Sequence, residues 1–352
     1  IQGSALLIDG ASPIIKNCRF IRNFSSINGG AAYIRGLSTT VIDECSFSLN
    51  SAVNFGGAIE IDATSGSLIK IENSNFTGNT AEFGGAIRSM DYDELIVNSS
   101  AFINNKAEGG GATYGDIKIE NSIFKYNSAQ NGGAVYGECK AVNSVFLNNS
   151  ATRKGGACHI KEGEFTNCSF SGNSSENGGG ISFYCSGSSL HTSSATNCIL
   201  WNNEASEEGN QLYFENTTDI NFTIGYSDIQ GGLESIFVRY DDGSFTLASE
   251  GNILDTDPLF VSNEVLNLTQ GSPCIDAGED NPPDGLNLDI LSSSRRLDGD
   301  NNGTAQTDIG AYEFQNGLPG IAVPQQRFQF TAFKEGAPAE TQTLEIYRTR
   351  TG

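Results

Sequence analysis

The chain has 352 residues, with 42 Asp and Glu against 20 Lys and Arg, which gives a formal net charge of −22 and a pI of about 4.3. A surface this acidic repels nucleic acid and anionic lipid and suits cations or neutral, hydroxyl-rich ligands, unless the charge only keeps a long β-protein soluble. No apolar run approaches the length of a membrane-spanning helix, so direct membrane insertion is not expected.

A short motif recurs along the first two hundred or so residues. It consists of Phe-x-x-Asn followed, eight or nine residues after the phenylalanine, by a pair of glycines. The phenylalanines are 22 to 29 residues apart, and Leu200 begins a degenerate further copy. Self-similarity at a period of about 20–50 residues indicates a repeat architecture. The seven copies begin at Phe20, Phe47, Phe76, Phe102, Phe124, Phe146 and Phe170.

The composition of each repeat favours strands. Its apolar runs are short, β-branched or aromatic, and interrupted by Gly, Asn and Ser. A unit of this length cannot bury its own apolar face, but copies stacked on one another can. The repeat therefore predicts an all-β, right-handed parallel β-helix, a pectin-lyase-like solenoid with one coil per repeat. Its phenylalanines would stack inside, its asparagines would form an amide ladder with a rise of about 4.8 Å, and its glycine pairs would turn corners.

The residue two positions before each phenylalanine of the motif is small. Cysteine and serine replace one another there, which indicates that size is the requirement. We expect the cysteines to be buried free thiols, with disulfides or metal ligation as the alternatives. This column consists of Cys18, Cys45, Ser74, Ser100, Ser122, Ser144, Cys168 and Cys198.

The sequence divides into three parts. Residues 1–215 form the repeat array, beginning at a residue other than methionine that we interpret as a processed or cropped end. Residues 216–317 lose the motif and become rich in Pro, Gly and Asp, as expected of irregular last coils and a C-terminal cap folded over the open end of the stack. Residues 318–352 are expected to form a linker and the first strands of a separate β-sandwich, with further domains of the same chain beyond. The tail from Phe328 is similar to the opening of immunoglobulin-like modules, which implies an immunoglobulin-like sandwich.

The strand after each glycine pair is where we look for chemistry. The second and fourth residues after the second glycine are mostly apolar and point inward, so the third and fifth point outward. These outward columns mix aromatics with both signs of charge and either bind glycans through tyrosines and carboxylates or form an ordinary solvated face. No catalytic residue is predicted. The candidate ligand-binding residues are Tyr33, Glu60, Asp62, Tyr114, Asp116, Tyr136, Glu138, His159 and Lys161.

Residues 298–304 have the D-x-D-x-N-G spacing of a calcium loop, with oxygen ligands at alternate positions and a glycine for the sharp turn. The glutamate expected at the twelfth position is replaced by Ile309, so Asp308 or Glu313 would have to substitute. The alternative is an acidic turn without metal. The predicted ligands of a structural Ca²⁺ are Asp298, Asp300, Asn302, Thr304 and Asp308, and no other cofactor is expected.

Two resemblances follow from these motifs. The F-x-x-N and G-G-A-[IV] elements of residues 76–87 and 124–135 resemble the polymorphic outer-membrane protein repeats, which are adhesin-type right-handed β-helix passengers. The segment DPLF…LNL…GSPCIDAG…DIGAYE of residues 257–313 looks like the "choice-of-anchor Q" module of secreted bacterial β-helix proteins. The resemblances imply a bacterial protein located outside the cell or at its surface, such as the outer membrane. Function does not follow from fold alone.

The uninterrupted repeat, the lack of a recognisable catalytic cluster and the partial following domain predict a non-enzymatic adhesin or scaffold module of a larger multidomain bacterial protein. Its partners would be glycans or surface proteins of a host or neighbouring cell. The alternative is a polysaccharide lyase or glycoside hydrolase that acts on an outward strand face, since parallel β-helices also carry such enzymes.

Overall fold

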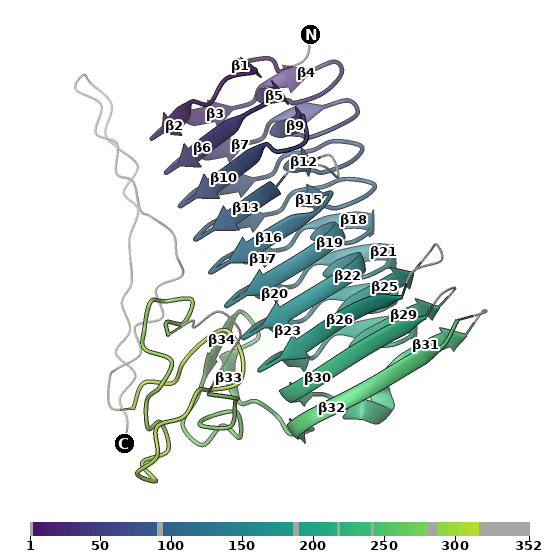
Figure 1. Ribbon diagram of the computed structural model, residues 1–352, viewed down its shortest axis with the longest axis vertical. Helices are drawn as coiled ribbons and strands as arrows, with labels where there is room; N and C mark the ends of the chain where they lie inside the picture. Colours follow the sequence, from purple (N-terminus) through teal and green to yellow (C-terminus); the bar gives the residue numbers. More distant parts are fainter. Residues whose placement is uncertain are drawn as a thin grey trace.

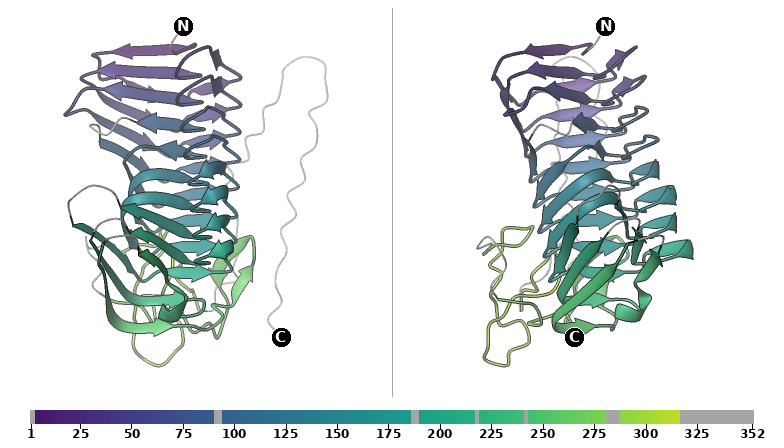
Figure 2. Two further views of the ribbon diagram at one scale, coloured as in Figure 1. Left: turned by 90° about the vertical axis from the view of Figure 1, so that its right-hand side faces the viewer. Right: turned by 45° about the vertical axis from the view of Figure 1, so that its right-hand side comes forward.

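The computed structural model describes residues 3–89, 94–185, 190–216, 219–240, 243–280 and 287–316. The described chain confirms the predicted right-handed parallel β-helix, whose coils are stacked from β1 (Leu6–Asp9) at one end to β32 (Phe245–Leu254) at the other (Figures 1 and 2). The immunoglobulin-like strands predicted within residues 318–352 lie outside the described residues. Apart from one short 3-10 helix, η1 (Leu233–Ser235), the described chain contains no helix.

The coils build four faces, named here in chain order after each glycine pair. The first face contains β1 (Leu6–Asp9), β5 (Ala32–Gly36), β9 (Ile59–Ala63), β12 (Ile87–Ser89), β15 (Thr113–Tyr114), β25 (Ile181–Cys185), β29 (Leu212–Asn216) and β31 (Phe237–Tyr240). The second contains β2 (Ile14–Lys16), β6 (Thr39–Asp43), β10 (Leu68–Glu72), β13 (Glu94–Asn98), β16 (Ile117–Glu120) and β26 (His191–Thr196). Strands β19 (Val135–Val142) and β22 (Cys158–Thr166) run across both of these faces.

The third face carries the phenylalanine motif. It contains β3 (Arg19–Ile21), β7 (Ser46–Ser48), β11 (Asn75–Thr77), β14 (Ala101–Ile103), β17 (Ile123–Lys125), β20 (Val145–Leu147), β23 (Ser169–Ser171) and β27 (Ile199–Trp201). Strands β30 (Ile220–Ile229) and β32 (Phe245–Leu254) run across the second and third faces. The fourth contains β4 (Phe24–Ser25), β8 (Ser51–Ala52), β18 (Ser128–Asn131), β21 (Ser150–Lys154), β24 (Ser174–Asn177) and β28 (Glu204–Glu208).

The predicted interior columns are present. From Phe20 to Phe170 the motif phenylalanines stack with ring centroids 4.5 to 5.3 Å apart and planes within 15° of parallel. From Asn23 to Asn203 each side-chain amide nitrogen donates to the amide oxygen of the next coil at 2.8 to 3.0 Å. The glycine pairs turn the corners as expected: Gly132 has a φ of 64°, and a Cβ on Gly133 would lie 2.0 Å from the carbonyl oxygen of Gly156.

The cysteines of the small column are free thiols. Cys45, Cys168 and Cys198 are buried, whereas Cys18 in the first coil is half-buried. Their thiols donate to backbone carbonyls, as in the bond from Cys168 Sγ to the Thr166 oxygen at 3.3 Å. The expectation of small, buried thiols therefore holds for three of the four positions.

Residues 255–316, called here the C-terminal module, contain the antiparallel hairpin β33 (Phe260–Ser262) and β34 (Val265–Leu268). The expectation that this part folds over the open end of the stack is wrong, because it lies beside the third face of the later coils (Figure 1). Leu266, Ile290 and Ala311 pack on Val145 and Leu147 of β20. A second cluster packs around Ile199 and Trp201, the single tryptophan of the chain.

An outer asparagine column fixes this position. Asparagines at positive φ between the second and third faces bond one another across coils, as Asn143 does to Asn121 at 3.2 Å. The fully buried Arg295 of the module donates from Nη2 to Asn143 Oδ1 at 2.8 Å, and the Glu279 backbone donates to Asn197 Oδ1 at 2.7 Å. The module therefore docks on a ladder that the repeat itself supplies.

Candidate functional site

The candidate site is the outer surface of the first face. Strand alternation holds, since Ile59 and Ile61 lie in the core while the residue between them points away from it. Several outward third-position side chains are nevertheless buried: Tyr33 is 3% exposed, Glu60 1% and His159 6%. Others are half-buried, such as Tyr114, which the ring of Phe83, just before a glycine pair, contacts edge-on at 5.2 Å.

In the early coils the predicted site residues bond to one another. Asp62 Oδ2 accepts from the Tyr33 hydroxyl of the preceding coil at 2.5 Å. Glu60 Oε1 accepts at 2.7 Å from the guanidinium of Arg88 in the following coil, which lies over the Phe55 ring. Burial raises the pKa of Glu60 to about 8, although Arg88 opposes this. Glu60 and Asp62 thus serve opposite coils and do not form a carboxylate pair for hydrolysis.

The later coils bring four rings together into what we call the aromatic row: Tyr114, Tyr136, His159 and Tyr184. Tyr114 and Tyr136 stack at 4.7 Å with planes 8° apart. The ring centroid of Tyr184 lies 5.6 Å from that of Tyr136 and 4.6 Å from that of His159. Tyr114 and Tyr136 stack, and the other ring pairs pack edge-on or tilted, so the rings partly cover one another and offer a ligand mainly edges and hydroxyl groups. A sugar would therefore contact the row more by hydrogen bonds than by stacking on a free ring face.

Charged groups border the aromatic row. The Glu138 backbone donates to Asp116 Oδ1 at 2.9 Å, and Lys161 Nζ lies 3.8 Å from Glu138 Oε1. Burial, reinforced by Asp116 and Glu162, raises the pKa of Glu138 above its usual value. The predicted residues Tyr114, Asp116, Tyr136, Glu138, His159 and Lys161 therefore belong to one region, separate from Tyr33, Glu60 and Asp62 in the early coils.

His159 is a weak candidate for acid–base chemistry. Burial, followed by the charge of Lys154, lowers its pKa to about 3. Its Nδ1 lies 3.3 Å from the Ser182 hydroxyl, so the neutral ring has a partner. An imidazole whose pKa lies so far below 7 binds protons too weakly to act as an efficient general base near pH 7. The geometry thus favours hydrogen bonding over catalysis by His159.

The carboxylates that converge at the predicted calcium loop are not the full set predicted from the sequence. Oxygens of Asp298 and Asp300 converge with one of Asp276, all within 4.8 Å of one another. The oxygen of Asn302 accepts from the Thr304 backbone at 2.8 Å. The three carboxylates also accept backbone N–H groups, which leaves lone pairs for a hard cation.

Asp308 lies beneath this loop rather than in the converging group. Its two oxygens accept backbone N–H groups, from Asp276 at 2.8 Å and from Phe314 at 2.5 Å. It is fully buried, and burial raises its pKa to about 7. Asp308 thus positions Asp276, which the spacing of the loop could not reveal. Asp276 lies in the segment GSPCIDAG. The available signal in the sequence was this carboxylate in a region rich in Pro, Gly and Asp.

The family model described as the right handed beta helix region matches residues 4–174, and with the stacked coils it defines the chain as a right-handed β-helix protein. No curated protein and no solved structure was found to match the chain. Within the described residues, no helix is long and apolar enough to cross a bilayer.

Proposed function

We propose that this chain is a non-enzymatic, extracellular or cell-surface module of a larger bacterial protein, in which the β-helix is a rigid rod that presents the aromatic row to glycans. The carrying observation is that three half-buried tyrosines and two carboxylates, Asp116 and Glu138, lie within the stretch of successive coils from β15 to β25. Hydroxyl and carboxylate groups at coil spacing suit a hydroxyl-rich chain. The acidic surroundings favour neutral or amine-bearing glycans over acidic ones.

The test is binding to an immobilised panel of neutral, amine-bearing and acidic glycans. The protein is compared with Tyr136→Ala and Tyr184→Ala variants, and with Tyr126→Ala as a control on a tyrosine outside the first face. The proposal expects binding that both row variants lose and the control keeps. If no glycan is bound, or if the row variants bind as well as the unaltered protein, the aromatic row is not the binding surface.

A second candidate function, hydrolysis of a polysaccharide, rests on one observation. Glu138, with its raised pKa, lies beside Asp116, the kind of unequal carboxylate pair that glycoside hydrolases use as acid and base. The assay follows reducing ends and unsaturated products from the same glycans. Product formation that Glu138→Gln abolishes would replace the adhesin proposal with this one.

We further propose that the loop with Asp276, Asp298 and Asp300 binds a structural Ca²⁺. The support is the convergence of three carboxylates from two segments of the C-terminal module. Carboxylate oxygens are ligands that Ca²⁺ prefers, and an ion shared by both segments would tie them together.

A further inference from the structure

The fourth face ends before the other three. Its last strand is β28, the final member of the parallel sheet β18-β21-β24-β28. The first face continues from β29 to β31, and the other two continue from β30 to β32. Where the next strand of the fourth face would come, the chain turns at Gly231 and Gly232 and forms η1. Within the described part of the chain, no strand pairs with the outer edge of β28.

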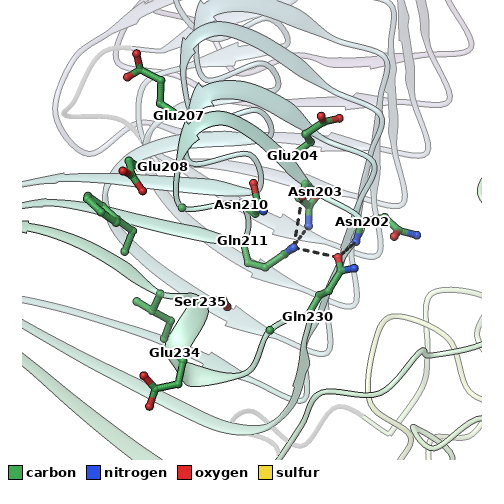
Figure 3. A pocket seen from close by; sticks show the side chains of 14 residues that line it. Asn202, Asn203, Glu204, Glu207, Glu208, Asn210, Gln211, Gln230, Glu234 and Ser235 are labelled. Atoms are coloured by element: carbon green, nitrogen blue, oxygen red, sulfur yellow. Dashed lines mark hydrogen bonds between the residues drawn. The ribbon is translucent and has the colours of Figure 1, made fainter.

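A cavity of about 640 Å³ occupies the place of this missing strand. Figure 3 shows it between β28 and the turn that carries Glu234 and Ser235, with the amides of Asn203, Gln211 and Gln230 grouped on one side. Phe237, at the start of β31, also lines the cavity. The space is therefore bounded by one strand edge and by the chain that passes below it.

Side-chain amides take the positions of the missing peptide groups. In earlier coils the alanine two residues after the ladder asparagine donates to the next coil's backbone, as Ala107 does to Ser128 at 3.0 Å. In β28 the equivalent Ala205 donates to Asn210 Oδ1 at 2.8 Å. The backbone N–H of Asn202 donates to Gln230 Oε1 at 2.8 Å, whereas its counterparts in earlier coils donate to backbone carbonyls.

The asparagine ladder ends in the same way. Asn203 Nδ2 donates to Gln211 Oε1 at 2.7 Å, where another asparagine would otherwise follow. The Gln211 nitrogen itself makes only long bonds, at 3.4 Å to Gln230 Oε1 and 3.5 Å to the Asn203 carbonyl. Bonds of this length are weak, so a buried amide beside the cavity is incompletely satisfied.

The edge is also acidic. Glu204, Glu207, Glu208 and Glu234 line the cavity, and among the described residues none of them forms an ion pair. On the two preceding strands the first residue, which pairs in register with Glu204, is a serine, Ser150 or Ser174. The negative charge is therefore concentrated where the sheet ends.

We propose that the edge of β28 docks an extended, basic segment of a partner protein as a parallel fifth strand of the sheet β18-β21-β24-β28. The segment would displace the Asn210 and Gln230 oxygens from the backbone donors and place Lys or Arg side chains beside Glu204 and Glu208. Main-chain bonds give such strand addition its affinity, and cross-strand pairs give it selectivity. Carboxylates on the edge repel acidic strands and attract basic ones. The edge is therefore protected against nonspecific strand pairing but can pair with a basic segment.

The test is a titration of the full chain with a blocked octapeptide of alternating lysine and threonine. Three matched peptides accompany it: one with glutamate for lysine, one with alternate backbone nitrogens methylated, and one in scrambled order with all lysines at one end. The proposal expects binding of the first peptide alone. Glu204→Lys should weaken this binding at least about fivefold, because a cross-strand attraction becomes a repulsion. Glu250→Lys on β32, which makes the same change of charge on another face, should leave it unaltered.

The amide variants test the displacement itself. Asn210→Ala and Gln230→Ala should raise the affinity for the alternating peptide, because each removes a competitor for a backbone donor of the edge. Circular dichroism confirms that each variant is folded before titration. Equal binding of the methylated peptide would show charge attraction without strand pairing and would overturn the proposal. No binding, or insensitivity to Glu204→Lys, would also overturn it. Lower affinity of the folded amide variants would overturn the displacement step.

Discussion

The interior amide ladder can be tested at Asn127, in the middle of the stack. Its side chain donates to the Phe102 carbonyl and to Asn149 Oδ1, both at 2.9 Å, and its oxygen accepts from the backbone and side chain of Asn105 at 3.0 Å. In Asn127→Ala the buried Phe102 carbonyl and Asn105 N–H lose these partners. Each buried group left without a partner costs about 1–3 kcal/mol, so we expect about 2–6 kcal/mol of destabilisation.

The assay is urea unfolding followed by far-UV circular dichroism, with Gln130→Ala as the control. Gln130 lies on the fourth face of the same coil and is exposed, so its truncation should change the free energy of unfolding by less than about 0.5 kcal/mol. If Asn127→Ala costs no more than this control, the ladder does not stabilise the stack and the reasoning from buried amide partners fails.

Three further predictions concern the C-terminal module. Burial raises the pKa of Asp308 to about 7 and, with the nearby Asp308 charge, that of Glu313 to about 9. Both groups favour the docked state while protonated, and this contribution is lost as pH rises through these values, so urea midpoints read from the single tryptophan should fall from pH 5 to pH 9. Leu147→Asp should undock the module, with a cost of about 3 kcal/mol or more from a buried unpaired charge, whereas Thr77→Asp, at the same column outside the contact, should not. Calorimetry should detect Ca²⁺ binding that alanine substitution of Asp298 and Asp300 abolishes.

Each of these predictions has an opposite outcome. Midpoints that are flat or that rise between pH 5 and pH 9 would mean that the buried carboxyl groups gain more from charged partners than they lose by burial. Tryptophan fluorescence unchanged in Leu147→Asp would remove β20 from the docking surface. Calcium binding that survives in the double variant would place the ion elsewhere, and no binding at all would leave an acidic turn.

The interior could be predicted from the sequence because neighbours in a solenoid are copies of one another. Once the motif fixed one coil, Phe124 had to meet Phe102 and Phe146, whatever the residues between them. The same periodicity placed the outward columns, including the tyrosines of the aromatic row. Local spacing and side-chain size were sufficient for these contacts.

The remaining features depend on contacts that no repeat encodes. The burial of Glu60 follows from Phe55, just before a glycine pair, and from Arg88, on the first-face strand of the next coil. The module's position beside the stack follows from Val145 and Leu147, outward residues of the third face that are apolar where β7 and β11 have serine, asparagine or threonine. These apolar residues were visible in the sequence. They indicate a docking surface only once it is known that they point outward and are covered by the module.

The most direct test of the stacked coils is a series of spin-label distances along the second face. One label, introduced as a non-natural amino acid to avoid the native thiols, replaces Lys70. The second replaces Lys118, Glu164 or Thr223, which lie two, four and six strands away in register. At about 4.8 Å per strand we expect distances of about 10, 19 and 29 Å. A Lys70–Thr223 distance as short as that of Lys70–Lys118 would mean a compact globule and would contradict the solenoid.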